Sequence, residues 1–237
     1  MTIHGLTKLT LLDYPGHIAC TVFSGHCNLR CPFCHNAPLV LFPDTQPQLA
    51  KDEFFAFLKK RRGTLEGVCV TGGEPTLAPG LLSFLEEIKA LGYLVKLDTN
   101  GTNPALLRQA TAAGLVDYIA MDIKSSPSRY AEAVGIPDFC TDTVKESANF
   151  LMHAGIPYEF RTTVVRELHN AATFSEIGEW LHGASACYLQ AFQPEGDLVC
   201  HFQKTPTPLT GYTAAELNVF LSLLTPHFNK VGLRGIS

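Results

Sequence analysis

The sequence predicts an α/β fold in which six strand–helix units follow one another as a partial (βα)6 barrel. Short apolar runs rich in β-branched residues alternate with segments of helical periodicity along the chain. This alternation is typical of parallel strands joined by right-handed helical crossovers. The length of 237 residues and the hydrophobic content of 46% allow one sizeable core. Six units are too few for a closed barrel of eight.

The expected strands combine apolar, β-branched and aromatic residues, the composition favoured in buried strands. They are residues 17–23, 67–71, 93–99, 118–123, 158–164 and 186–192. The expected helices are residues 51–62, 80–90, 104–113, 143–153, 173–182 and 213–224. Gly92, Gly114 and Gly155 follow three of these helices, at the position where a left-handed residue commonly ends a helix.

Three of the expected helices open with Thr-x-x-Glu, the pattern of a capping box. The pairs are Thr143/Glu146, Thr173/Glu176 and Thr213/Glu216. No linker, repeat or low-complexity segment interrupts the series. We therefore expect a single domain, with its core over about residues 15–195 and a C-terminal helical extension over about 198–237.

Polar residues gather where the expected strands end, which is the edge that carries the active sites of parallel α/β barrels. A cysteine loop follows the first strand and Gly72-Gly73-Glu74 follows the second. The third strand ends in Asp98 and Thr99, and the end of the fourth carries Asp122 and Lys124. Arg161 lies on the fifth strand, and the sixth ends at Phe192 and Gln193. We expect these residues to share one rim of the sheet.

The cysteine loop has the spacing C-x3-C-x2-C at Cys27, Cys31 and Cys34. Three thiolates can hold three irons of a 4Fe–4S cluster and leave the fourth iron open, whereas ferredoxins bind all four with cysteine. A zinc site completed by His26 or His35 is the alternative, but zinc sites more often use two separate C-x2-C pairs. The spacing favours an iron–sulfur cluster that takes part in chemistry.

The bulk composition excludes several classes of function. The net charge of −4 and the pI of about 6.1 give no sign of a nucleic-acid or anionic-membrane surface. The first residues lack the pattern of a signal peptide, and no apolar run of 18 residues is present. We expect a cytoplasmic protein with reduced thiols, in which Cys20 and Cys69 are small buried hydrophobes. Cys187 and Cys200 remain open as ligands of a second cluster.

The run CNLRCPFC, followed by TGGEP at residues 71–75, resembles the radical S-adenosylmethionine (SAM) superfamily over about residues 5–195. The resemblance implies that the open iron binds the amino and carboxylate groups of SAM and that the reduced cluster releases a 5′-deoxyadenosyl radical. It implies that the strand edge at Gly72 and Gly73 meets the SAM amino group, which Glu74 helps to orient. The resemblance implies that Phe33 packs on the adenine; shielding of the cluster is the alternative role, and the two are compatible.

Two further motifs resemble the activases of glycyl radical enzymes. They are LDTNG at residues 97–101 and MDIK at residues 121–124. The resemblance implies that Asp98, Asp122 and Thr99 help to hold a monovalent cation beside the SAM carboxylate, a role that suits paired carboxylates. It places Lys124 near SAM or the substrate loop. A plain turn at Asn100-Gly101 is the alternative for the first motif.

Three residues of the later strands are candidates for SAM contacts. Arg161 suits a bidentate pair with the SAM carboxylate, and it equally suits a buried ion pair within the protein. The resemblance implies that Phe192 and Gln193, where the sixth strand ends, contact the adenine. The family's glycine-rich G-x-I-x-G-x-x-E segment is missing here, so contacts to the ribose are not assigned.

The segment of residues 9–36 carries a D-x-P-G sequence at Asp13–Gly16 and most resembles the activating proteins of anaerobic ribonucleoside-triphosphate reductases. The resemblance implies a glycyl radical enzyme as protein partner, most simply an anaerobic ribonucleotide reductase, and flavodoxin or ferredoxin as electron donor. An activase of a pyruvate formate-lyase-type enzyme is one alternative. A radical SAM enzyme acting on a small purine-like molecule is another. The third alternative is a non-enzymatic iron–sulfur or zinc module.

Overall fold

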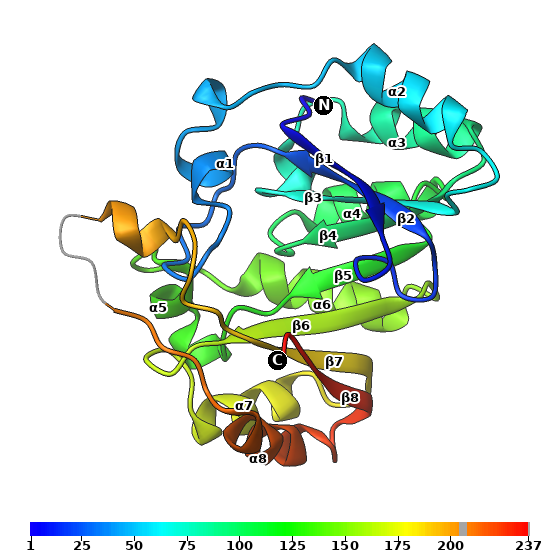
Figure 1. Ribbon diagram of the computed structural model, residues 1–237. Helices are drawn as coiled ribbons and strands as arrows, with labels where there is room; N and C mark the ends of the chain where they lie inside the picture. The colour runs from blue at the N-terminus through cyan, green and yellow to red at the C-terminus, as the bar shows by residue number, and fades with distance from the viewer. Residues whose placement is uncertain (204–207, 237) are drawn as a thin grey trace. The chain divides into compact units, whose positions relative to one another are not determined.

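The computed structural model describes residues 1–203 and 208–236 and has an α/β fold (Figure 1). Within these residues, eight strands form one sheet in chain order: β1 Gly5–Thr10, β2 Ala19–Ser24, β3 Gly67–Gly72, β4 Leu94–Thr99, β5 Tyr118–Asp122, β6 Tyr158–Val164, β7 Ala184–Ala191 and β8 Phe228–Arg234. In the described part of the chain, no helix is long and apolar enough to cross a bilayer.

The α-helices lie between the strands along the chain. They are α1 Ala37–Leu41, α2 Lys51–Lys60, α3 Leu81–Ala90, α4 Pro104–Ala112, α5 Tyr130–Val134, α6 Asp142–His153, α7 Ala171–Trp180 and α8 Ala214–Leu224. The described part of the chain also contains short 3-10 helices: η1 Pro43–Thr45, η2 Pro75–Leu77, η3 Pro127–Arg129 and η4 Val199–Phe202.

Contacts divide the chain into two compact units. The first unit contains Met1–Asn28, Pro38–Thr99 and Asn103–Ala120. The second unit contains Leu29–Ala37, Asn100–Thr102 and Met121–Ser237. The cysteine loop thus contributes residues to both units, with Cys27 in the first and both Cys31 and Cys34 in the second. The single domain expected from the sequence stays a prediction.

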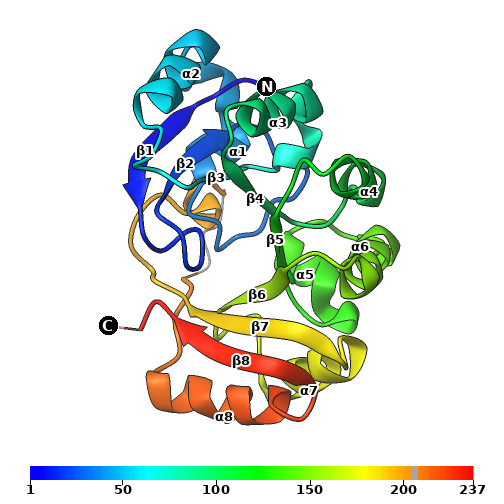
Figure 2. The ribbon, with the colours of Figure 1, turned by 90° about the vertical axis from the view of Figure 1, so that its right-hand side faces the viewer.

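The first unit is built on β1 to β4. Strand β1 runs antiparallel to β2, while β2, β3 and β4 pair in parallel. Figure 2 shows α2 and α3 beside these strands. Their apolar faces meet in an aromatic cluster, in which the Phe54 and Phe84 rings stack with centroids 5.4 Å apart and Phe55 packs on both. All three are buried, so the cluster fixes the helices on this part of the sheet.

The second unit contains the parallel strands β6, β7 and β8. Helices α7 and α8 lie along them (Figure 2). The Phe174 and Phe220 rings stack between the two helices with centroids 4.7 Å apart. The fully buried carboxylate of Glu159 accepts two hydrogen bonds from Arg234, at 2.6 and 2.7 Å. This bidentate pair connects β6 to the end of β8.

The α/β fold with a mostly parallel sheet is confirmed, and the six strands expected from the sequence are β2 to β7. Two strands, β1 and β8, and two α-helices, α1 and α5, were not expected, and neither were the short 3-10 helices. Strand β2 begins two residues later than expected, because the Glu66 carboxylate holds His17 and Ile18 ahead of the strand. Gly92, Gly114 and Gly155 follow their helices with positive φ, as expected.

Of the three expected capping boxes, the one at Thr213 and Glu216 is confirmed. The box at Thr173 and Glu176 is wrong, because α7 begins at Ala171 and Asn170 caps it with Thr173 as the reciprocal partner. Glu176 instead accepts hydrogen bonds from Ser128. The box at Thr143 and Glu146 is also wrong: α6 begins one residue before Thr143, and its N-cap residue, Thr141, makes no side-chain cap.

Candidate active site

The TGGEP loop is packed against the start of the cysteine loop within the first unit. Gly73 N–H donates to the Ser24 carbonyl at 2.9 Å, and Glu74 N–H donates to the His26 carbonyl at 2.7 Å. A Cβ atom on Gly72 would lie 2.2 Å from the Ser24 oxygen, and one on Gly73 would lie 1.9 Å from the His26 oxygen. The two glycines are therefore required by the backbone that leads to Cys27, a reason separate from any contact with SAM.

The Glu74 side chain is buried and held by two threonines. Its Oε1 atom accepts hydrogen bonds from the backbone and hydroxyl of Thr76 and from the Thr99 hydroxyl at 2.8 Å. Glu74 thereby caps η2 and connects the end of β3 to the end of β4. Two residues expected at the SAM site, Glu74 and Thr99, are thus in direct contact with each other.

Asp98 forms an ion pair with Lys96, two residues earlier on β4. The Lys96 side chain is 1% exposed, and its ammonium also lies 3.7 Å from the Cys69 Sγ atom. A buried ammonium is stable only with such a partner, so Asp98 compensates the charge of Lys96. Cys69 and Cys20 are fully buried, as expected of small hydrophobes.

The second half of the cysteine loop is held by backbone hydrogen bonds within the second unit. Arg30 N–H donates to the Val134 carbonyl at 2.9 Å, at the end of α5. Cys200 N–H donates to the Pro32 carbonyl at 2.9 Å, and Val199 N–H donates to the Cys34 carbonyl at 3.1 Å. Sequence reasoning gave the C-terminal segment no role, but here η4 supports the loop. Cys200 and Cys187 are buried, and burial raises the pKa of the Cys187 thiol to about 12.

Asp122 lies between two cationic side chains at the end of β5. Lys124 Nζ donates to Asp122 Oδ2 at 2.9 Å, and Arg161 Nε donates to Oδ1 at 2.8 Å. Burial opposes ionisation of this carboxyl, but the charges of Arg161 and Lys124 outweigh it and hold the pKa well below its usual value. The sequence left Arg161 open as an ion-pair partner or a SAM ligand, and the structure contains the ion pair.

Lys124 also interacts electrostatically with two cysteines of the loop. Burial lowers its pKa, but Asp122 and then the thiols of Cys31 and Cys34 raise it well above the usual value. The pKa of Cys34 is raised by burial, and Lys124 opposes that rise. A three-thiolate cluster carries negative charge, so an ammonium beside two of its ligands would stabilise it.

Two residues that sequence reasoning did not assign to the site fix the backbone of Lys124. Lys124 N–H donates to the Tyr130 hydroxyl at 3.3 Å, and its carbonyl accepts from His169 Nε2 at 2.8 Å. His169 is fully buried, with Nδ1 accepting from Val165 N–H at 3.0 Å. Phe33, expected on the adenine, is buried with its ring edge-on to His169 at 6.3 Å. No motif or spacing marks His169 among the nine histidines of the chain.

Gln193, the expected adenine contact at the end of the sixth strand, adjoins the cysteine loop. Its carbonyl accepts from His35 Nε2 at 2.8 Å, and its side-chain amide donates to the Gly235 carbonyl at 3.1 Å. The neighbouring Phe192 ring lies 5.7 Å from the His35 ring. Within the second unit, Phe192 and Gln193 therefore lie against His35, the residue that follows Cys34.

The donor set fits an iron–sulfur cluster: three thiols on one loop, with Cys31 buried and Cys27 and Cys34 partly exposed. Within residues 1–203 and 208–236, no three His, Cys, Asp or Glu side chains surround the position of a single metal ion. Cluster thiolates need no such common point, because each binds a different iron. Asp98 and Asp122, the expected cation ligands, belong to different units, and each has a cationic partner of its own.

Comparison with protein families agrees with this donor set. The family described as the Radical SAM superfamily matches residues 21–181 of the chain. That range contains all three cysteines of the loop, TGGEP, LDTNG, MDIK and Arg161.

Curated relatives extend the comparison. A protein of Methanocaldococcus jannaschii, assigned by its name to the glycyl-radical enzyme activating enzymes, is 27% identical over 87% of this chain and 86% of its own length. The 7-carboxy-7-deazaguanine synthase of Neisseria meningitidis is 34% identical over 43% of this chain and 41% of its own. The pyruvate formate-lyase-activating enzyme of Listeria monocytogenes is 30% identical over 52% of each chain.

Among solved structures, Streptococcus suis SuiB is similar in fold, with a TM-score of 0.68 and 14% sequence identity. The similarity covers 91% of this chain, which spans about half of SuiB, or 48% of its length. At this identity the likeness concerns the fold alone.

Proposed function

Because the chain belongs to the radical SAM superfamily, we propose that it is a glycyl-radical-enzyme activase that holds a 4Fe–4S cluster through Cys27, Cys31 and Cys34. When bound, the cluster and SAM supply a carbon-centred radical that removes a hydrogen atom from a substrate carbon. The observation that carries the proposal is the loop with three thiols, which leaves one iron for SAM. The relative from Methanocaldococcus jannaschii, which matches this chain over 86% of its own length, supports the activase assignment.

The chain's own residues position and protect the cofactors. Gly72 and Gly73 let the TGGEP backbone approach the loop that leads to Cys27. Lys124 places positive charge beside Cys31 and Cys34, and Tyr130 and His169 hold its backbone. Phe33 excludes water from the buried side of the loop. Our predicted SAM-site residues stay Phe33, Gly72, Gly73, Glu74, Asp98, Thr99, Asp122, Lys124, Arg161 and Gln193.

We propose an anaerobic ribonucleotide reductase as the protein partner and flavodoxin or ferredoxin as the electron donor. The N-terminal segment that resembles reductase-activating proteins supports this choice. A pyruvate formate-lyase-type partner is the second candidate, supported by the relative in Listeria monocytogenes, which is 30% identical over about half of each chain. The proposal includes a monovalent cation at Asp98 and Asp122, which would compete with the cationic partner that each carboxylate has.

A different candidate is a radical SAM enzyme that acts on a purine-like small molecule. The 34% identity over 101 residues to a 7-carboxy-7-deazaguanine synthase favours it. That similarity covers 43% of the chain, whereas the similarity to the activating enzyme covers 87%. We therefore rank the small-molecule enzyme second.

The first test uses anaerobically reconstituted protein, with iron, sulfide and 5′-deoxyadenosine measured in one sample. Cys31→Ala should lose most of the cluster and all SAM cleavage. Cys140→Ala removes an exposed thiol outside the loop and should retain both. SAM cleavage by Cys31→Ala at the wild-type rate would refute the assignment of the ligands.

The second test adds partners to the wild-type protein with SAM and reductant. With anaerobic ribonucleotide reductase from the same organism, a glycyl-radical doublet in the electron paramagnetic resonance spectrum and an equal amount of 5′-deoxyadenosine would support the proposal. A doublet only with a pyruvate formate-lyase-type enzyme would change the partner. Cleavage stimulated by a deazapurine precursor, with no doublet on either enzyme, would favour the small-molecule candidate.

A further inference from the structure

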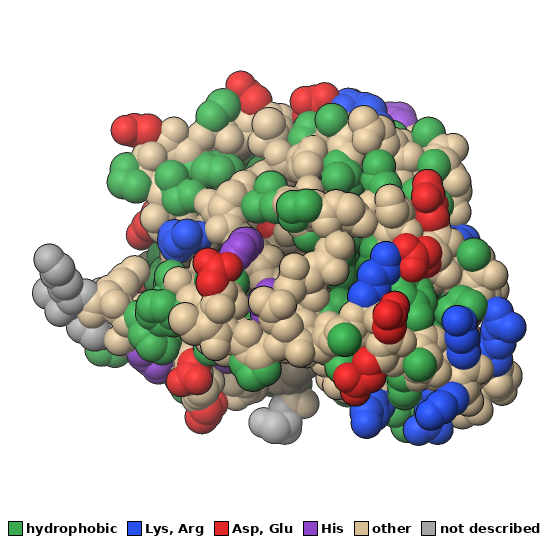
Figure 3. Space-filling model, turned by 90° about the horizontal axis from the view of Figure 1, so that it is seen from above, with side chains coloured by type: hydrophobic (Ala, Val, Ile, Leu, Met, Phe, Trp, Pro, Cys, Tyr) green, Lys and Arg blue, Asp and Glu red, His purple; other side chains and the backbone are tan. Residues whose placement is uncertain are grey.

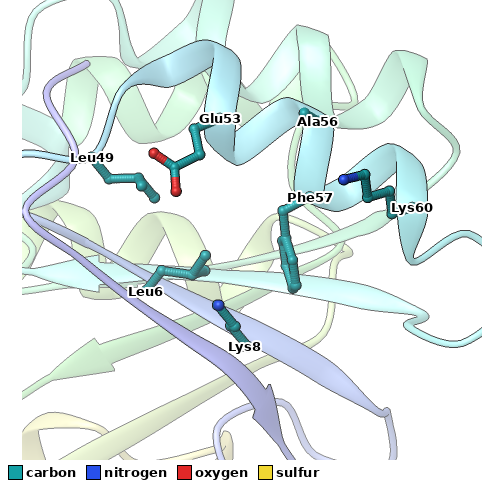
Figure 4. A pocket seen from close by; sticks show the side chains of 7 residues that line it. All are labelled: Leu6, Lys8, Leu49, Glu53, Ala56, Phe57 and Lys60. Carbon is teal, nitrogen blue, oxygen red and sulfur yellow. The ribbon is translucent and has the colours of Figure 1, made fainter.

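A groove of about 490 Å³ lies between β1 and α2 within the first unit (Figure 4). Its lining residues come from the strand, the helix and the turn before the helix: Leu6, Lys8, Leu49, Glu53, Ala56, Phe57 and Lys60. None of them belongs to the cysteine loop or to the TGGEP, LDTNG and MDIK motifs. The groove is therefore a feature separate from the proposed active site.

The groove follows from the way α2 packs. The helix buries Phe54, Phe55 and Leu58 in the core. Its lining residues, at positions 53, 56, 57 and 60, are spaced i, i+3, i+4 and i+7 and so form a second face. Across the gap, Leu6 and Lys8 are alternate residues of β1 and point to the same side of the strand, as Figure 4 shows.

Three charged side chains border this apolar gap. Lys8, Glu53 and Lys60 are exposed, and within the described residues none of them has a hydrogen-bond or ion-pair partner. The groove thus carries a local charge of +1 in a chain whose net charge is −4. Figure 3, seen from the side on which α2 lies in Figure 1, shows Lys and Arg side chains at one end, interspersed with Asp, Glu and hydrophobic ones.

The backbone of β1 offers an edge for another strand. β1 is the first strand in the sheet order and pairs with β2 on one side. On its other side, Leu49 N–H donates to the Ile3 carbonyl at 2.8 Å in an antiparallel bridge. Among the described residues, no pairing continues that bridge along β1, where residues 7–9 are exposed. An unpaired edge of this kind accepts an added strand.

We propose that the groove binds an extended acidic segment of a partner protein, which continues the Leu49 bridge as a strand along β1. Every second side chain of that strand would face the groove, with apolar groups against Leu6 and Phe57. Carboxylates would meet Lys8 and Lys60, which have no anion of their own within the described part of the chain. The segment is acidic because the two ammonium groups outnumber the single carboxylate, and extended because the strand edge supplies backbone donors and acceptors.

The test uses a fluorescein-labelled decapeptide in which glutamate and valine alternate, with binding followed by fluorescence anisotropy at low salt. The Lys8→Glu/Lys60→Glu double variant should bind it about tenfold more weakly, because two exposed charge pairs become repulsive. The control double variant Lys59→Glu/Lys145→Glu makes the same change in net charge at exposed lysines outside the groove and should change the affinity less than about twofold. A peptide alternating lysine and valine should not bind.

Unchanged unfolding midpoints would show that both double variants are folded. If the groove variant does not fold, Lys8→Gln/Lys60→Gln replaces it, with a smaller loss expected. Equal weakening in groove and control variants would overturn the proposal and assign the binding to net charge. No binding of the acidic peptide to the wild-type protein would overturn it as well. So would a wild-type dimer in sedimentation that the groove variants dissociate, since the occupant would then be a second copy of the chain.

Discussion

The contact between TGGEP and the cysteine loop predicts a severe effect for one added methyl group. In Gly73→Ala, the new Cβ would lie 1.9 Å from the His26 carbonyl oxygen, where real Cβ atoms stay beyond 3.0 Å. The loops must therefore separate by more than an ångström. That movement breaks the hydrogen bonds from Gly73 to Ser24 and from Glu74 to His26.

The size of the effect follows from these parts. Two backbone hydrogen bonds contribute about 1 kcal/mol each, and overpacking adds about 1–3 kcal/mol. We expect Gly73→Ala to lower the free energy of unfolding by about 3–5 kcal/mol, which is a fall in Tm of about 10 °C for a chain of this size. Urea and thermal unfolding of the cluster-free protein measure it without interference from the cofactor.

Gly92→Ala is the matched control. Gly92 has φ of 86° and nothing within 4 Å of an added Cβ, so only backbone strain of about 1–2 kcal/mol is expected. Gly73 has no such positive φ, and its penalty comes from the contact alone. If Gly73→Ala lost no more stability than Gly92→Ala, the close approach of the two loops would be wrong.

Three further changes test other contacts. His169→Phe should cost about 2–4 kcal/mol because two backbone groups lose their partners, while His153→Phe on an exposed site should be nearly neutral. Burial lowers the pKa of His169, so the unfolded chain binds the proton first: wild-type stability should fall as pH drops below about 6.5, and this part of the fall should vanish in His169→Phe. Arg234→Ala leaves the Glu159 carboxylate buried without its bidentate partner and should cost about 3 kcal/mol in urea unfolding; a loss below about 1 kcal/mol would contradict the pair. Thr213→Ala should lower stability by about 1 kcal/mol through loss of the α8 cap, and Thr213→Ser should restore most of it.

The parts of the fold that the sequence predicts are those whose pattern is local. The buried strands β2 and β3 have continuous apolar runs, and the long helices have periodic ones. Strands β1 and β8 were missed because their residues are largely exposed or half-buried, so GLTKLT and FNKVGLR show no apolar face. Helix α5 has five residues, too few for a periodic signal.

The site shows a similar division. Cysteine spacing and strand-end motifs mark the residues, but their partners depend on packing between distant segments. Position 73 requires glycine because of a contact with a distant segment: the atom that would clash with a side chain there is the carbonyl oxygen of His26. A lysine within a strand is expected on an exposed face, and nothing in KLDT indicates that Lys96 is buried against Asp98. His169 reaches Lys124 from 45 residues away.

The ion pair at Asp122 separates two roles for Arg161 that the sequence left open. If Arg161 serves mainly as the partner of Asp122, its replacement should change the stability of the protein even when SAM is absent. The two side chains are 12% and 27% exposed, so we expect a coupling of about 1–2 kcal/mol in a double-mutant cycle of Arg161→Gln and Asp122→Asn, measured by urea unfolding. Lys124 remains beside Asp122 in each variant and limits the loss from either single change. A coupling near zero, with SAM affinity lowered by Arg161→Gln alone, would refute the structural role and assign the guanidinium to the SAM carboxylate. A clear coupling with equal SAM affinity in Arg161→Gln and wild type would make Arg161 a residue that positions Asp122 and Lys124 beside the cysteines.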